Sequence, residues 1–272
     1  MLAPIVPVKI KSKSIVTIYR HTQGQGETVV VLHGWGLNHQ VWQPIMAPLA
    51  ESHQLIAIDL PGFGRSDWPT GKAISFANMV ALVSAEIPAG AHLIGWSLGG
   101  LIASAIALQQ PRNIASLTTI ASSPKFQADE QWPGIDSKVL DNFHLQLQRS
   151  YDKTIERFLA IQAMGDEHAR AQVKWLKPLV LEQPEPNLTV LDQALDWLAD
   201  VDLRAQLPNI SVPLLRYYGR LDSLVPNRAI AEIDKLVPKS AKHVDPQASH
   251  APFISDPQQF IDRWLAFTNP TR

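Results

Sequence analysis

The sequence has no cysteine, almost no net charge and no long apolar run, and each absence excludes a class of function. Without cysteine among its 272 residues, the chain cannot form disulfides, use a thiolate nucleophile or bind a metal through cysteine. A formal net charge of −1 gives no general electrostatic reason to bind nucleic acid. No run approaches the ~20 apolar residues of a membrane span. Residues 1–10 lack the charged start and apolar core of a signal peptide, so we expect a cytoplasmic protein.

What is present is the composition of an ordinary globular protein, with 46% hydrophobic and 18% charged residues. Apolar, β-branched runs predict strands over 14–19, 28–32, 55–59, 92–96 and 117–121. Helical spacing or composition predicts helices between them, over 41–50, 76–87 and 98–110. This alternation is typical of an α/β protein with a mostly parallel sheet and right-handed crossovers.

The alternation stops after the fifth predicted strand. Four helices are predicted in succession, over 137–149, 151–164, 166–180 and 188–199. A strand over 214–218 and helices over 226–237 and 257–267 then resume the first pattern. We therefore predict one discontinuous core domain, 1–122 and 203–272, with an all-helical lid, 123–202, lying over the carboxyl edge of the sheet.

A serine stands at the sharpest predicted turn of the core. Gly95-Trp96-Ser97-Leu98-Gly99 joins a buried strand to an Ala-rich helix and has the pattern G-x-S-x-G. In that context the turn strains the serine backbone and exposes its hydroxyl above the sheet. A Cβ at Gly95 or Gly99 would collide with the neighbouring helix or strand. The pattern predicts a nucleophilic serine.

Such a serine needs a general base and a group that orients the base. His250 lies in a loop late in the chain, and Asp222 directly follows the resumed strand, which gives the order Ser, acid, His. The alternative for Asp222 is a cap for a turn or helix. Asp202 and Asp245 are weaker candidates for the acid, because Asp202 closes the helical block and Asp245 follows no clear strand.

Two backbone N–H groups are expected to form the oxyanion hole. One is that of Leu98, fixed by the serine turn, and the other is that of Trp35, in the glycine-rich loop after the second strand. His33 in the same loop is better explained as a brace than as a catalytic group. Asp59, with the turn that follows it, is likewise expected to be structural.

The motifs HGWG, DLPGFGRS, GWSLGG, GRLDSLVP and SHAPF resemble those of the α/β-hydrolase superfamily, in the same order and over essentially the whole chain. Segments such as 121–124, 132–135, 156–160 and 250–255 are similar to one family within it. Its members are carboxylesterases that hydrolyse the methyl ester of pimeloyl-acyl carrier protein in biotin synthesis. The lid segments carry most weight, because lids are where members of the superfamily differ.

The resemblance implies a monomeric, cytoplasmic serine carboxylesterase that needs neither cofactor nor metal and binds an acyl carrier protein bearing the pimeloyl methyl ester. It further implies a substrate-binding set and a carrier-docking set. The substrate-binding set is Trp35, Ser97, Leu98, Phe158, Leu159, Ala160, Ile161, Gln162 and His250. The docking set is Lys153, Arg157, Arg170 and Lys174, of which the two lysines replace arginines of that family.

The spacing of the lid residues gives an independent argument. Lys153 and Arg157 are four residues apart and share one helix face, and the apolar side chains are expected on the opposite face. Arg170, Lys174 and Lys177 repeat the arrangement on the next helix. Such cations are ordinarily solvated surface charges, yet together they suit an acidic partner.

Other functions stay open at this point. On the same fold the chain could be a general short-chain carboxylesterase, a C–C bond hydrolase or a lyase of menaquinone synthesis. A different class is a ligand receptor that keeps the three residues without catalysis. The first dozen residues look like an extension, for which the sequence gives no functional account.

Overall fold

The computed structural model describes residues 17–269, and the strands of this part of the chain form one seven-stranded sheet. The strands are β1 Arg20–Gln23, β2 Glu27–Leu32, β3 His53–Ile58, β4 Ala91–Trp96, β5 Ile114–Ile120, β6 Leu214–Gly219 and β7 Ala241–Asp245. They lie in the order β1-β3-β2-β4-β5-β6-β7. Only β1 is antiparallel to its neighbour. The predicted mostly parallel sheet is confirmed.

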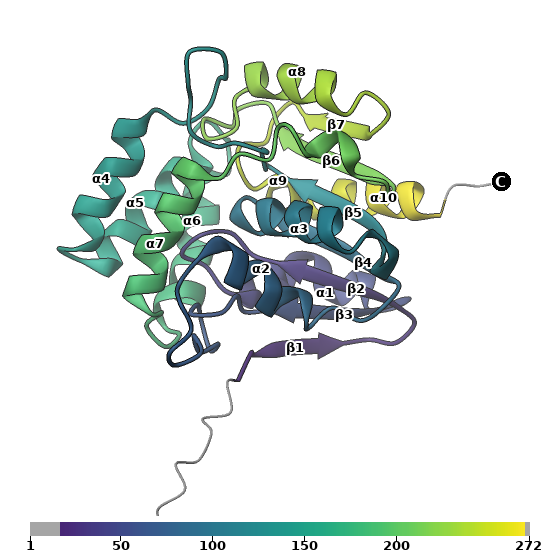
Figure 1. Cartoon of the computed structure of the whole chain (residues 1–272), viewed down its shortest axis with the longest axis horizontal. Coiled ribbons are helices and arrows are strands. Elements are labelled where there is room, and N and C mark those ends of the chain that lie inside the picture. The colour runs from purple at the N-terminus through teal and green to yellow at the C-terminus, as the bar shows by residue number, and fades with distance from the viewer. Residues whose placement is uncertain (1–16, 270–272) are drawn as a thin grey trace, which may run out of the picture.

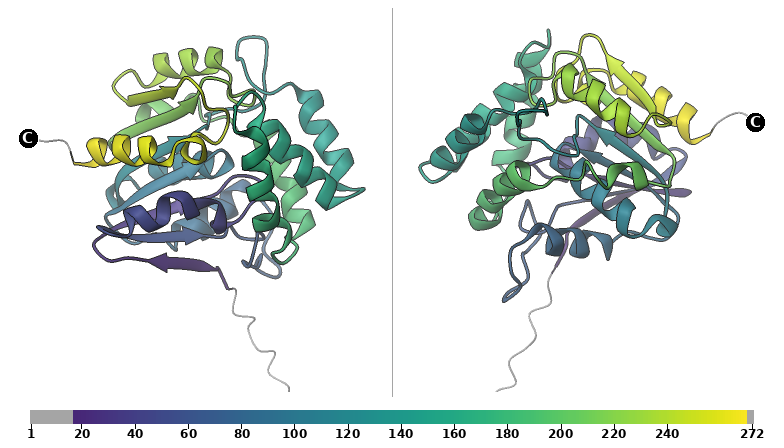
Figure 2. Two further views of the ribbon diagram at one scale, coloured as in Figure 1. Left: turned by 180° about the vertical axis from the view of Figure 1, so that it is seen from behind. Right: turned by 45° about the horizontal axis from the view of Figure 1, so that its top comes forward.

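The central strands are buried because helices cover both faces of the sheet. Every residue of β4 and the last four of β2 are buried, as expected of apolar runs in a parallel sheet. Helices α2 Phe76–Ser84 and α3 Leu98–Gln109 pack together on one face, while α1 Gln43–Leu49 and α10 Pro257–Thr268 cover the other (Figures 1 and 2). Helix α8 Asn227–Leu236 joins β6 to β7, and the short α9 Pro252–Ser255 precedes α10.

Four helices come between β5 and β6 in the chain and lie together at one end of the sheet (Figure 1, teal to green). They are α4 Ser137–Leu147, α5 Tyr151–Ala163, α6 Ala169–Leu181 and α7 Leu188–Asp200. Side-chain oxygens of Asp136, Ser150 and Asn187 accept backbone N–H groups at the starts of α4, α5 and α7. These helices occupy the segment predicted as a lid, and the division of the chain into two domains stays a prediction.

The sequence predictions are weakest at the edges of the sheet. Residues 14–16 of the first predicted strand lie outside the described residues, as does the N-terminal extension, and Thr17–Tyr19 are not in a strand. The edge strand is instead β1, whose four residues are all exposed, so no apolar alternation marks it. The sequence also predicts a weak strand before His250, and the structure confirms it as β7, whereas α9 was not predicted. Among the described residues, no helix is long and apolar enough to cross a membrane.

Candidate active site

Ser97 lies at the sharp turn between β4 and α3, and its backbone has the positive φ of 55° that L-residues rarely adopt. Two glycines make the turn possible. A Cβ at Gly95 would lie 2.3 Å from the carbonyl oxygen of Gly99, and a Cβ at Gly99 would lie 2.2 Å from that of Leu32. The helix and strand could not approach so closely with any other residue, as the sequence predicted.

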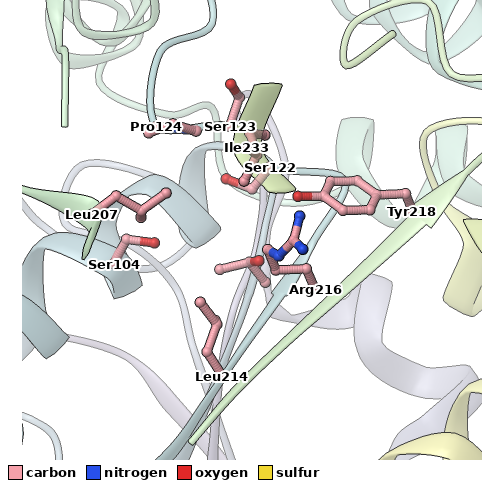
Figure 3. Close-up of a pocket in the computed structure, with 10 residues that line it drawn as sticks. Ser104, Ser122, Ser123, Pro124, Leu207, Leu214, Arg216, Tyr218 and Ile233 are labelled. Atoms are coloured by element: carbon pink, nitrogen blue, oxygen red, sulfur yellow. The ribbon is translucent and has the colours of Figure 1, made fainter. Parts of the chain in front are cut away.

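The rear of this turn is held by Ser122, whose Oγ donates to the carbonyl oxygen of Ser97 at 2.8 Å. Ser122 also lines a small cavity of about 20 Å³ between α3 and β6 (Figure 3). In that cavity the buried Arg216 lies beside Tyr218, and neither Ser97 nor His250 is among the lining residues. The cavity in Figure 3 is therefore a separate feature behind the candidate site.

His250 and Asp222 form a buried pair. His250 Nδ1 donates to Asp222 Oδ2 at 2.8 Å, and both side chains are fully inaccessible to solvent. The other carboxylate oxygen, Oδ1, accepts the N–H groups of Leu224 at 2.8 Å and Val225 at 3.0 Å. Asp222 thus caps its own turn and orients the imidazole at the same time. Because the carboxylate accepts the proton on Nδ1, Nε2 is the nitrogen free to act as a base.

The backbone of His250 is fixed from two sides. Trp96, the neighbour of Ser97, donates its indole N–H to the His250 carbonyl at 2.7 Å, and the His250 N–H donates to the Gln162 carbonyl at 3.0 Å. His250 Nε2 is buried without a hydrogen-bond partner among residues 17–269. The structure therefore has no hydrogen bond between Ser97 and His250 Nε2, and such contacts often tighten only when substrate is bound.

Neither rival acid contacts His250. Asp202 is paired with Arg204 at 2.7 Å, and the hydrogen bonds from Arg204 lower the pKa of its carboxyl. Asp245 accepts the N–H groups of Gln247 at 2.8 Å and Ala248 at 3.2 Å. The expectation that Asp245 follows no clear strand is wrong, because it is the last residue of β7.

The glycine-rich loop after β2 runs beside the serine. A Cβ at Gly34 would lie 3.3 Å from the Cβ of Ser97. Trp35 in this loop is fully buried. Its indole N–H donates to the Leu191 carbonyl of α7 at 2.9 Å, and its ring packs edge-on against Phe158 at 4.8 Å between centroids. The loop thus joins the serine turn to the lid, and the oxyanion roles of Trp35 and Leu98 stay predictions.

His33 uses both ring nitrogens within the fold. Its Nδ1 donates to the Gly34 carbonyl at 2.8 Å, and its Nε2 accepts the Leu60 N–H at 2.9 Å. Burial lowers the pKa of His33 to about 4, although Asp59 partly opposes this shift. A neutral imidazole with no free nitrogen acts as a brace.

Asp59 is buried in the turn that follows β3. It accepts the His39 N–H at 2.6 Å, the His39 ring at 2.8 Å and the Arg65 N–H at 2.9 Å. Burial alone would raise the pKa of Asp59, but the His39 hydrogen bond and the nearby imidazoles lower it overall. Its bonds hold the turn together, which agrees with the structural role expected from the sequence.

Ser97 borders a tight apolar cavity of about 10 Å³ beneath the lid, which is room for about one water molecule. The other lining residues, all apolar, are Phe126, Ile135, Val139, Leu140, Phe143, Phe158, Leu195, Leu198 and Leu224. They come from α4, α5, α7, the loop before α4 and the turn after Asp222. The surroundings of the serine are therefore apolar, which suits contact with an aliphatic chain.

Helix α5 brings part of the predicted substrate segment inward. Phe158, Leu159 and Gln162 are buried, whereas Ala160 is exposed and Ile161 is half-buried on the other side. The side-chain oxygen and nitrogen of Gln162 are both buried without a hydrogen-bond partner among the described residues. An amide left unpaired in an interior is costly, and the substrate-binding role of Gln162 stays a prediction.

The predicted docking cations Lys153, Arg157, Arg170 and Lys174 are all exposed on the lid. Within the described residues none of them has an ion pair within 4.0 Å, whereas Lys177 pairs with Glu156 at 2.7 Å. Of the five cations predicted on the lid, four therefore have no ion pair among the described residues, and Lys177 is paired with Glu156. No group of three or more potential metal ligands lies together in residues 17–269.

Sequence reasoning missed the residues that hold the reacting groups through their backbones. Trp96 lies within the G-x-S-x-G motif and Ser122 within the segment 121–124, but their bonds to His250 and Ser97 join residues 154 and 25 positions apart. No local pattern signals such pairings.

Comparison with known proteins assigns the chain to a protein family. The family described as having the alpha/beta hydrolase fold matches residues 27–257, and the chain belongs to this family. Two solved structures share the fold over 93% of the chain. They are an esterase from Exiguobacterium antarcticum (TM-score 0.85, 24% identity, 96% of that chain) and a bromoperoxidase from Bacillus anthracis (TM-score 0.83, 18% identity, 95% of that chain).

More similar relatives narrow the class. The chain is 50% identical over 239 residues to the pimeloyl-(acyl-carrier protein) methyl ester esterase of Aeromonas salmonicida, covering 88% of this chain and 94% of the relative. It is 48% identical over 254 residues to the protein of the same name from Pectobacterium carotovorum, covering 93% and 99%. The match includes the lid as well as the core.

Proposed function

We propose that this chain is a serine carboxylesterase that hydrolyses the methyl ester of pimeloyl-acyl carrier protein, releasing methanol, in biotin synthesis. The observation that carries the proposal is the buried His250–Asp222 pair beside Ser97. The sequence similarity to the named esterases extends over almost their whole length, the lid included. A cytoplasmic, monomeric enzyme is part of the proposal, because the sequence resembles that family throughout.

The reaction proceeds in two halves. Ser97 Oγ attacks the ester carbonyl while His250 Nε2 takes its proton, and Asp222 keeps the Nδ1 proton in place. The oxyanion is held by the N–H groups of Trp35 and Leu98, each contributing on the order of 3 kcal/mol to the barrier reduction. His250 returns the proton to the departing methoxide, and methanol leaves. Water activated by His250 then cleaves the acyl-enzyme and frees the carboxylic acid and Ser97.

The cavity explains why the distal ester is the one attacked. The aliphatic chain lies against the apolar walls, and the amide of Gln162 meets a polar atom of the substrate. The carrier docks on the lid, with its acidic surface against Lys153, Arg157, Arg170 and Lys174. Its phosphopantetheine arm therefore ends at the entrance, and only the far end of the acyl chain reaches Ser97. The thioester stays intact because it lies too far from Ser97.

The test is mass spectrometry of pimeloyl-carrier methyl ester after incubation with the protein. The expected product is the carrier lighter by one methylene, with no free carrier thiol. Free thiol released as fast as methanol would contradict the geometry. Turnover of p-nitrophenyl acetate but not of the carrier ester would indicate a general short-chain esterase. Absence of turnover on either substrate would indicate a receptor.

A further inference from the structure

The junction between α5 and α6 is hydrogen-bonded to the loop that carries His250. Besides the bond from the His250 N–H to Gln162, Ser249 Oγ donates to the Met164 carbonyl at 3.0 Å. Farther along, Ser255 Oγ donates to Asp166 Oδ2 at 2.5 Å. Three bonds within one short segment of the lid thus reach the base loop.

Asp166 is the centre of this connection. It is a buried carboxyl group, 6% exposed, that no step of the proposed reaction uses. Its Oδ1 accepts the His168 N–H at 2.7 Å, and its Oδ2 accepts the Gln172 amide at 2.8 Å as well as the Ser255 hydroxyl. Gln172 Nε2 also lies 3.0 Å from Ser255 Oγ. Asp166, Gln172 and Ser255 therefore close a triangle of hydrogen bonds, which we name the latch.

The latch holds the end of a short helix close to His250. Ser255 is the last residue of α9, the four-residue helix Pro252–Ser255 that begins two residues after His250. On the core side, Trp96 holds the His250 carbonyl. His250 is consequently held from the core by Trp96 and Asp222, and from the lid through its own N–H group, Ser249 and Ser255. A shift of the α5–α6 junction would be transmitted to the imidazole.

We propose that Asp166 is a positioning residue for His250, acting through Ser255 so that a closed lid and an aligned base are the same state. The inference rests on the proposed function of Ser97 and His250. It extends that function by making the lid part of the catalytic alignment as well as the wall of the cavity. Misplacing a catalytic group by a fraction of an ångström to 1 Å is enough to lower turnover severely.

The test uses Ser255→Ala, which removes the hydroxyl and leaves Asp166 bonded to Gln172. Turnover of p-nitrophenyl acetate should show a kcat about tenfold lower with little change in KM. Inactivation by a fluorophosphonate, which needs Ser97 and His250 but no later hydrolysis step, should slow by the same factor. Ser255→Thr keeps the hydroxyl and should restore both rates. Gln172→Leu, which weakens the same latch, should lower both rates in the same direction.

The matched control is Asp192→Asn. It weakens a lid bond of similar length, from His144 Nδ1 to Asp192 Oδ1 at 2.8 Å, that does not touch the base loop. Both rates should stay close to wild type in this variant. Equal losses in Ser255→Ala and Asp192→Asn, or wild-type rates in Ser255→Ala and Gln172→Leu, would overturn the inference. Failure of the proposed function is distinguishable. If Ser97 and His250 are not catalytic, the wild-type protein itself neither turns over p-nitrophenyl acetate nor reacts with the fluorophosphonate. If only the carrier substrate is wrong, both wild-type rates remain measurable and the latch variants still test the inference.

Discussion

The core and the lid differ in how they hold their functional groups. Ser97, Asp222 and His250 lie on loops that follow strands, and each is at most 5% exposed, with its backbone or carboxylate bonded to a neighbouring segment. The lid cations such as Arg157 and Arg170 lie on exposed helix faces without ion pairs among the described residues. Burial in the core defines one reacting geometry, whereas solvated charges on the lid can act only at longer range.

This difference indicates that the core loops determine hydrolysis and the lid determines which substrate is hydrolysed. Changes to the core loops should abolish hydrolysis of every ester, because all substrates share the reacting atoms. Changes to the lid cations should affect only the substrate that arrives on a protein. The latch at Asp166 is the exception, since it belongs to the lid and acts on the core.

The largest effect is expected from Ser97→Ala. The loss is chemical, so the fold should be retained while kcat for any ester falls by about a millionfold, as for other catalytic serines. Steady-state assays with a small ester and circular dichroism would measure the two properties. Residual activity above about a thousandth of wild type would mean that another group is the nucleophile.

Asp222→Asn should rank second, with kcat lower by about ten-thousandfold, because the amide favours the wrong tautomer of His250. The matched variants are Asp202→Asn and Asp245→Asn, whose carboxylates contact other groups. Both should keep most of their activity with a small ester. A nearly active Asp222→Asn beside an inactive Asp245→Asn would reassign the acid.

The third effect concerns the stability of the core loop that carries His33. Its pKa is lowered from 6.5 to about 4 in the folded protein, so between these values the unfolded chain binds a proton that the folded chain does not. The free energy of unfolding must therefore fall as the pH falls through this window. His33 should account for about 2 kcal/mol between pH 7.5 and pH 5.

Urea unfolding of the wild type and His33→Gln at these two pH values measures this contribution. The variant has no titrating group at this position, so its stability should depend less on pH. Equal pH dependence in both proteins would show that His33 is not held neutral by its burial.

The smallest and most selective effect is expected from Arg157→Glu combined with Arg170→Glu. Turnover of the carrier-bound ester should fall about tenfold in kcat/KM through slower association, while p-nitrophenyl acetate is unaffected. The control is Arg112→Glu with Lys239→Glu, which makes the same change in net charge at exposed positions preceding β5 and β7. Parallel losses on both substrates in the lid variant would mean that the cations support the fold and not a partner.

The sequence predicted the core well because its functional residues follow buried strands. Apolar runs marked β2, β4 and β6, and the turns after them carried Trp35, Ser97 and Asp222 to one edge of the sheet. The edge strand β1 was misplaced because all its residues are exposed, and β7 gave only a weak signal because it is short and partly exposed. Their pairing is decided by backbone bonds to neighbours far away in the sequence.

The contacts between lid and core could not be predicted. The bond from Ser255 to Asp166 spans 89 residues, and that from Trp96 to His250 spans 154. A serine or an aspartate in a short loop is usually a turn former or a cap. Only the folded structure shows that these side chains form hydrogen bonds to a distant segment of the chain.

The central claim is that the core carries out hydrolysis and the lid selects the carrier-bound substrate. The salt dependence of substrate preference tests this claim most directly. The measurement is the ratio of kcat/KM for pimeloyl-carrier methyl ester to that for dimethyl pimelate, which has the same acyl chain, as sodium chloride is raised. Attraction between solvated charges is screened beyond about 8 Å at physiological ionic strength, so the ratio should fall steadily in the wild type and less steeply in the Arg157→Glu, Arg170→Glu variant. A ratio that stays constant with salt would contradict the account, because the lid would then play no electrostatic part in choosing the substrate.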